Sequence, residues 1–130
     1  MSYNLFLDDT RDPKDAYLYD EKKSLFEETF TINWIVVRNY ESFVKVIRDM
    51  GLPQVVSFDH DLHFEHVRHY AEQTLLTGCI DYEIFNNKTG KHCADFLVQY
   101  AREKGQPLPT CYVHSANDHG RKNIKRALGL

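Results

Sequence analysis

The stretch Val55-Val56-Ser57-Phe58-Asp59-His60-Asp61-Leu62 most constrains how this chain can fold. Its first half is a short apolar run with two β-branched residues, which predicts a buried strand. The strand ends in acid, imidazole and acid. Two carboxylates so close together repel each other and are costly to desolvate, so they need a cation, a positive side chain or open water. In an open parallel α/β sheet, the carboxyl ends of the strands border the crevice in which ligands bind.

Three other segments have a related form. Leu5-Phe6-Leu7 runs into Asp8-Asp9, and Cys111-Tyr112-Val113 runs into His114-Ser115. Residues 32–37 are rich in β-branched and aromatic side chains and predict a further strand, which ends at Arg38. Arg38 either reaches an anion bound beside the acids or is an ordinary surface arginine. The polar residues after these strands are therefore expected to gather at one edge of a sheet.

The order of the segments predicts an α/β fold. Apolar residues at helical spacing predict helices over residues 40–50, 89–104 and 121–128, with a weaker signal over 22–30 and a turn over Asn117–Gly120. Because crossovers between parallel strands are right-handed, four strands connected in this way favour the order 2-1-3-4. We expect three layers: an open, flavodoxin-like or receiver-like sheet with helices on both faces.

Length and charge set further limits. The 130 residues fit one domain, 1–130, and a net charge of −3 gives no general attraction to duplex nucleic acid. The three cysteines form no CxxC pair, so reduced thiols in a cytoplasmic protein are the simplest interpretation. No apolar run approaches the roughly 20 residues that span a membrane.

Residues 62–88 are too long for an ordinary loop between a strand and a helix, which takes about 2 to 6 residues. We interpret them as an insertion that lies over the active face. The row His60, His63, His66 and His69 resembles a metal site, but steps of three fall about 60° short of a helical turn, so all four cannot meet one ion. We interpret the row as the exposed face of a short lid helix, with a His63–His66 metal pair as the alternative. Residues 79–87 suggest a short hairpin or edge strand.

The acids and histidines together predict a site for phosphate chemistry. Asp8, Asp9 and Asp59 would offer oxygen ligands to a divalent cation, Mg²⁺ or Mn²⁺. His60 and His114 could transfer protons to or from water and a leaving alkoxide, with Asp59 or Asp61 orienting His60. The chain has no Gly-rich phosphate loop, GxSxG elbow or HExxH motif, which argues against nucleoside triphosphatases, esterases and zinc proteases.

Five motifs resemble one known family. They are LFLDDTRDP, WIVVRNYESF, VVSFDHDL, the Thr89-Gly90 helix start and VHSANDHGRKNI, and they resemble the cyclic-phosphate processing receiver domains. The resemblance implies a receiver-like fold and a role in processing cyclic phosphates, such as a cyclic nucleotide or an RNA end with a 2′,3′-cyclic phosphate. The motif residues that it carries over are Asp8, Asp9, Arg11, Asp59, His60, Asp61, His114, Ser115, Asn117, Gly120 and Asn123. The last strand ends in His-Ser rather than lysine, which argues against signalling through a phosphorylated aspartate.

We therefore expect a metal-dependent hydrolase, a phosphodiesterase that opens a cyclic phosphate. Its catalytic residues would be His60, His114, Asp59 and Asp61, and its metal ligands Asp8, Asp9 and Asp59. Contacts to the phosphate, or support for the turn beside it, would come from Arg11, Arg38, Ser115, Asn117 and Asn123. The alternative is a non-catalytic receiver-like module that binds a ligand or a protein, although such a module has no need of two imidazoles among the acids.

Overall fold

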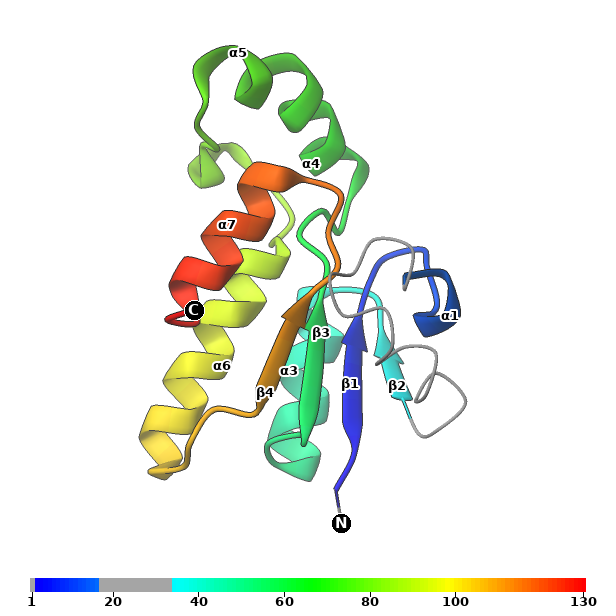
Figure 1. Cartoon of the computed structure of the whole chain (residues 1–130), viewed down its shortest axis with the longest axis vertical. Helices are drawn as coiled ribbons and strands as arrows, with labels where there is room; N and C mark the ends of the chain where they lie inside the picture. The colour runs from blue at the N-terminus through cyan, green and yellow to red at the C-terminus, as the bar shows by residue number, and fades with distance from the viewer. Residues whose placement is uncertain (1, 17–33) are drawn as a thin grey trace.

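A four-stranded parallel sheet forms the centre of the protein. The computed structural model describes residues 2–16 and 34–130 (Figure 1). The sheet has the order β2-β1-β3-β4, as predicted, and this is an α/β receiver-like fold. Its strands are β1 (Asn4–Leu7), β2 (Trp34–Val37), β3 (Val55–Phe58) and β4 (Thr110–Val113).

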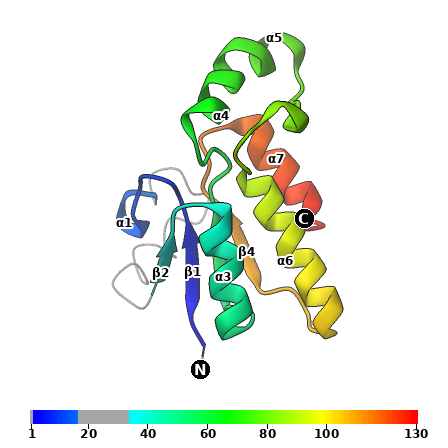
Figure 2. The ribbon, with the colours of Figure 1, turned by 180° about the vertical axis from the view of Figure 1, so that it is seen from behind.

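Three long helices accompany the described strands: α3 (Tyr40–Met50), α6 (Gly90–Lys104) and α7 (Asp118–Ala127). Helix α3 lies behind the sheet in Figure 1 and in front of it in Figure 2, where α6 is seen beside it and α7 beyond α6. A short helix, α1 (Pro13–Ala16), follows β1. The helix predicted over residues 22–30 and the start of the strand predicted over 32–37 lie outside the described residues. No helix in the described ranges is both long and apolar enough to span a membrane.

The two faces of the sheet carry different apolar groups. Leu5 and Leu7 belong to the main core, together with Phe43 of α3 and Leu97 of α6, and all four are fully buried. Phe6 points to the opposite face, because side chains alternate along a strand, and it packs against neighbours on β2. This alternation decides on which face each side chain beyond the strand ends will lie.

The insertion folds as a helical segment above the strand ends (Figure 1). It comprises α4 (Phe64–His69), the π-helical turn η2 (Tyr70–Thr74), α5 (Leu75–Thr77) and the 3₁₀ turn η3 (Tyr82–Ile84). The hairpin or edge strand predicted over residues 79–87 is therefore wrong. Apolar residues at Tyr82, Ile84 and Phe85 suggested a strand, but the side chain of Asp81 accepts from the backbone N–H of Glu83 and caps a helical turn instead.

The interpretation of the histidine row as an exposed face is also wrong. His66 and His69 are buried, with only 1% and 6% of their surface exposed. His66 Nδ1 accepts from the backbone N–H of Leu62 (2.9 Å), and Nε2 donates to the Asn87 carbonyl (2.7 Å). His69 Nε2 accepts from the backbone N–H of Asp81 (3.2 Å). These rings hold the returning chain against α4. Backbone partners satisfy both nitrogens of His66 and Nε2 of His69, whereas His69 Nδ1 has no partner among the described residues.

Two glycines allow close contacts around His60. The backbone N–H of Gly90 donates to the His60 carbonyl (2.8 Å), and a Cβ at Gly90 would overlap the Asp59 carbonyl. A Cβ at Gly120 would lie 2.7 Å from both Cδ2 and Nδ1 of the His60 ring. Both helix starts thus pack directly on the chain that follows β3.

The starts of α6 and α7 are set by their caps. The predicted N-cap at Thr89 is confirmed, since its hydroxyl accepts from the backbone N–H of Lys91. The turn predicted over Asn117–Gly120 is wrong, because α7 begins at Asp118. The Asn117 side chain accepts from the Gly120 N–H (2.9 Å) and caps the helix.

Candidate active site

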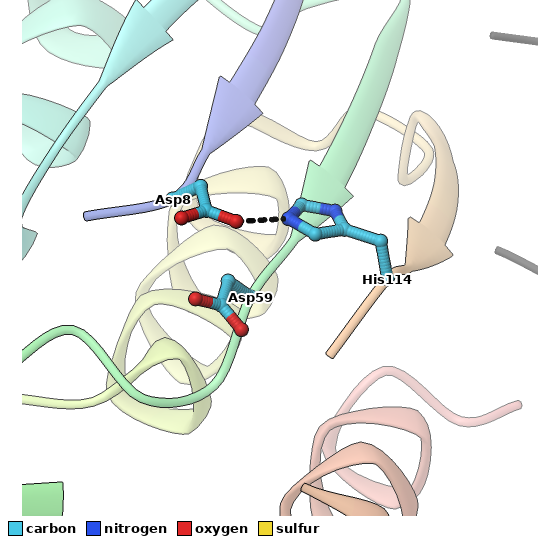
Figure 3. Close-up of side chains that lie close together, drawn as sticks. All are labelled: Asp8, Asp59 and His114. Atoms are coloured by element: carbon cyan, nitrogen blue, oxygen red, sulfur yellow. Dashed lines mark hydrogen bonds and ion pairs between the residues drawn. The ribbon is translucent and has the colours of Figure 1, made fainter. Parts of the chain in front are cut away.

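The register of the sheet brings three ionisable side chains into one row. Leu7, Phe58 and Val113 are the last paired residues of β1, β3 and β4. The next residues along the three strands are Asp8, Asp59 and His114, and the backbone N–H groups of Asp59 and His114 still donate across to Leu7 and Phe58. Their ligand atoms lie within 4.8 Å of one another (Figure 3). This cluster, called the acid row below, follows directly from parallel pairing.

Asp8 is fully buried and well satisfied. Its Oδ1 accepts from the backbone N–H groups of Thr10 (3.0 Å) and Arg11 (2.9 Å). Its Oδ2 meets Arg11 Nε (3.0 Å) and His114 Nε2 (3.1 Å). Burial alone would raise the pKa of Asp8, but the hydrogen bonds from His114 and these backbone groups outweigh it and lower the pKa to about 2. Asp8 is therefore ionised at neutral pH.

The surroundings of Asp59, unlike those of Asp8, disfavour the ionised carboxylate. It is 3% exposed, and burial together with the negative charge of Asp8 raises its pKa well above the usual range. Arg11 offsets this only partly, with Nη2 3.5 Å from Asp59 Oδ1. Burial and the charge of Asp8 also raise the pKa of Asp9. The acid row thus gathers more negative charge than the arginine beside it neutralises.

His114 is held from three sides. Its ring stacks on Phe6, with centroids 4.5 Å apart and planes 4° from parallel. Nε2 meets Asp8, and Nδ1 lies 2.7 Å from the Ser57 hydroxyl. Because ionised Asp8 can only accept, His114 Nε2 must donate to it, which leaves Nδ1 to accept from Ser57. His114 therefore fixes the orientation of Asp8.

His60 is also buried and has a partner at each ring nitrogen. Its Nδ1 lies 2.6 Å from Asp61 Oδ1, and its Nε2 lies 2.9 Å from the Tyr82 hydroxyl. Asn117 Nδ2 donates to the same Asp61 oxygen (3.1 Å). With a carboxylate at Nδ1, the N–H lies there and the Tyr82 hydroxyl donates to Nε2. Asp61 is thereby held in place by two donors.

A cavity of about 510 Å³ opens over these strand ends and is called the strand-end cavity below. One side of its lining is polar and the other, contributed by the insertion, is largely apolar and aromatic. Neither His60 nor His114 is among the described residues that line it. The polar side includes Asp9, Arg11, Asp59, Asp61, Ser115 and Asn117, and the insertion contributes Phe64, Val67 and Tyr70.

The sequence matches the family model of the cyclic-phosphate processing receiver domain over residues 3–129. The chain belongs to this family. The match covers the acid row, the FDHDL segment and the HSxNxxGxxN segment that caps α7. Comparisons with curated proteins and with solved structures gave no significant match.

Two of the residues predicted to contact the phosphate in this receiver domain do not line the strand-end cavity. Arg38 donates to the carbonyls of Asp8 (3.2 Å) and Arg11 (2.6 Å) and to Asp12 Oδ1 (2.7 Å), so it fastens the loop after β1. Asn123 lies on α7, where its Nδ2 donates to the Tyr82 hydroxyl (2.9 Å). Ser115 and Asn117 do line the cavity, and the Ser115 hydroxyl accepts from the Asn117 N–H (3.1 Å).

Sequence reasoning did not identify three residues of the site. Tyr82 lies far along the insertion and gave no signal. Phe64 resembles any apolar helix residue, although 73% of its surface is exposed at the cavity. Ser57 did carry a signal, because it is the one polar residue in the otherwise apolar strand β3.

The acid row is suited to a hard divalent cation. Asp8 and Asp59 offer carboxylate oxygens, Asp9 lies beside them, and the negative charge of Asp8 contributes to the raised pKa of both Asp9 and Asp59. Arg11 bridges Asp8 and Asp59; it also lines the cavity, and 25% of its side chain is exposed. His114 is engaged with Asp8, so its part would be to orient that ligand rather than to bind the ion itself.

Proposed function

We propose that this receiver domain is a metal-dependent phosphodiesterase that hydrolyses a cyclic phosphate on a nucleotide or an RNA end. The observation that carries the proposal is the two-sided lining of the strand-end cavity. A carboxylate cluster with Arg11 suits a metal-bound phosphate, and the apolar side suits a flat base. The name of the family, cyclic-phosphate processing receiver domain, agrees with this chemistry.

The proposed phosphate position lies beside Arg11. This side chain lines the cavity and reaches Asp59 only at 3.5 Å, so it can exchange that contact for a phosphate oxygen. Ser115 and Asn117 lie on the same polar side, at the start of α7. Phe64, Val67 and Tyr70 would then contact the base or ribose.

In the proposed metal complex, Asp8, Asp9 and Asp59 hold the cation. Bound there, Mg²⁺ or Mn²⁺ would supply charge neutralisation at the phosphoryl oxygens. Deprotonated carboxylates are required, and a cation would favour this form of Asp59. His114 and Ser57 keep Asp8 directed toward the row.

In the proposed hydrolysis, a water oxygen bonds to phosphorus, one ribose P–O bond breaks, and the freed ribose oxygen gains a proton. Asp61 is the group on the cavity lining that can accept the proton of water, with His60 behind it at 2.6 Å to share the charge. The same pair then returns a proton to the ribose oxygen. Because His60 and His114 do not line the cavity, we assign both to positioning and to support of the carboxylates.

The test is a turnover screen with 2′,3′- and 3′,5′-cyclic nucleotides and RNA ending in a 2′,3′-cyclic phosphate, each with Mg²⁺, Mn²⁺ or EDTA. Asp61→Asn should lower kcat by about 10²- to 10⁴-fold with a small change in KM. Asp49→Asn, which alters an exposed aspartate on α3, is the matched control and should leave kcat unchanged. Wild-type kcat in Asp61→Asn would contradict the assignment.

Calorimetric titration with Mn²⁺ tests the metal separately from turnover. The wild type and Asp49→Asn should bind, and Asp59→Asn should lose the binding heat. Equal binding by Asp59→Asn would remove the acid row as the metal site.

The second candidate is a module that binds a cyclic phosphate without cleaving it. It is favoured by one observation, that Arg11 already bridges Asp8 and Asp59 where a cation would otherwise neutralise them. The same screen separates the two: a ligand that binds in EDTA, displaces Arg11 and is recovered intact with either metal would support the module and refute the enzyme.

A further inference from the structure

A second cavity, of about 590 Å³, lies between the insertion and the helices α6 and α7. Figures 1 and 2 both show the insertion at the end of these two helices, away from β1 and β2. Among the described lining residues, Lys91, Lys122 and Arg126 are positively charged and Asp95 is negatively charged. The chain as a whole has a net charge of −3, so this excess of cations is local. We call this the helix-side cavity.

The three cationic side chains form only weak ion pairs and hydrogen bonds within the protein. Lys91 pairs with Asp95 (2.7 Å) and Lys122 with Asp118 (3.2 Å), each across one helical turn. Such exposed pairs contribute little to stability, because water screens them. Arg126 Nη1 reaches Asn123 Oδ1 at 3.4 Å, a long hydrogen bond. All three side chains can therefore turn toward an anion at small cost.

The floor of the helix-side cavity is polar and ordered. Asn123 donates to the Tyr82 hydroxyl, which in turn donates to His60 Nε2, and His60 Nδ1 donates to Asp61. Tyr82 and Asn123 line the helix-side cavity, whereas Asp61 lines the strand-end cavity. Asn123, a residue of the family motif, thus lines the helix-side cavity and not the strand-end cavity.

The remaining lining suits a flat, partly apolar group. Tyr82 presents an aromatic ring, with Lys91 Nζ 5.5 Å from its centroid, and Ile80 adds an apolar side chain. His119 also lines this cavity, and its Nδ1 has no hydrogen-bond partner within the described structure. A volume of this size fits a ligand larger than phosphate alone.

We propose that the helix-side cavity is a second ligand site, which binds a phosphorylated small molecule of nucleotide size. Lys122, Arg126 and Lys91 bind its phosphate groups, and Tyr82 and Ile80 contact its ring. The site is separate from the acid row and contains none of the proposed metal ligands. It therefore does not depend on whether the strand-end cavity is catalytic.

The test uses four probes: phosphate, pyrophosphate, adenosine 5′-monophosphate and adenosine. Binding is followed by amide NMR shifts and calorimetry in EDTA. Pyrophosphate and the monophosphate should bind, with shifts at Lys91, Lys122 and Arg126. Adenosine should bind at least 10-fold more weakly than its monophosphate. If phosphate alone matches the monophosphate, a nucleotide-sized ligand is refuted.

The matched variants remove equal charge at two places. Lys122→Gln combined with Arg126→Gln should weaken the binding of adenosine 5′-monophosphate by 10-fold or more. Lys45→Gln combined with Arg68→Gln breaks similar pairs, with Asp49 and Glu72, and should change the affinity by less than twofold. Equal weakening by both double variants would show a general charge effect and overturn the site. Amide NMR shifts confined to Thr10, Arg11 and Ser115, which line the strand-end cavity, would also overturn the site.

Discussion

Substitution of Gly120 by alanine tests the packing that holds His60. The new Cβ would lie 2.7 Å from Cδ2 and Nδ1 of the ring, whereas ordinary contact begins at 3.4 Å. Cγ of the ring lies closer still, so the ring must retreat by more than 0.7 Å, which strains its bonds to Asp61 and Tyr82. Overpacking of this kind costs about 1–3 kcal/mol in the free energy of unfolding.

The same substitution should raise the unfolding free energy, instead of lowering it, when the His60 ring is absent. In a His60→Ala background the three atoms nearest to the Cβ are absent, and alanine is favoured over glycine in a helix by about 0.5–1 kcal/mol. The coupling energy between the two sites should therefore be about 1.5–4 kcal/mol, measured by urea unfolding followed by circular dichroism.

Two outcomes would refute this reasoning. The first is an equal change in unfolding free energy in both backgrounds. The second reads the ring directly: unchanged ¹⁵N shifts of the His60 imidazole in Gly120→Ala would show that the ring has not moved, and this measurement remains available if His60→Ala fails to fold.

Two further predictions concern charge. Asp59→Asn should raise the unfolding free energy in EDTA at pH 7 by roughly 0.5–2 kcal/mol, because it removes a buried carboxylate beside Asp8. Since the pKa of Asp59 is raised in the folded protein, the unfolding free energy of the wild type should fall as pH rises through that pKa. The Asp49→Asn variant should show the same fall and Asp59→Asn should not, as measured by urea midpoints at pH 4 to 8. Burial lowers the pKa of His66 in the folded protein. Neutral His66 therefore stabilises the fold above pH 6.5, and this stabilisation is lost as pH falls through the pKa of the folded state. Exchange of the Leu62 amide, corrected for its intrinsic rate, should then be faster at pH 5 than at pH 7.5 in the wild type and insensitive to pH in His66→Gln.

The position of the acids could be predicted because it depends on short-range rules. Short apolar runs located the strands, and right-handed crossovers ordered them. Parallel pairing then places Asp8 next to Asp59, whatever the loops do. The N-cap at Thr89 was predicted because it rests on neighbouring residues alone.

The depth of the histidines could not be predicted. Whether His114 faces a cavity or packs under it depends on the stack with Phe6 and on Ser57, which come from two other strands. His66 is buried because the carbonyl of Asn87, 21 residues later, returns to meet it. Contacts between distant residues decide burial, and no local pattern encodes them.

Counting along the strands explains why the acid row tolerates no shift. Asp8, Asp59 and His114 each stand one residue beyond the last paired position. A single residue added to or removed from any one strand would turn its side chain to the opposite face of the sheet. The same change would exchange the core residues of that strand with those on its other face. The lengths of β1, β3 and β4 are therefore fixed twice, by the core that they fill and by the side chains that they carry at their ends.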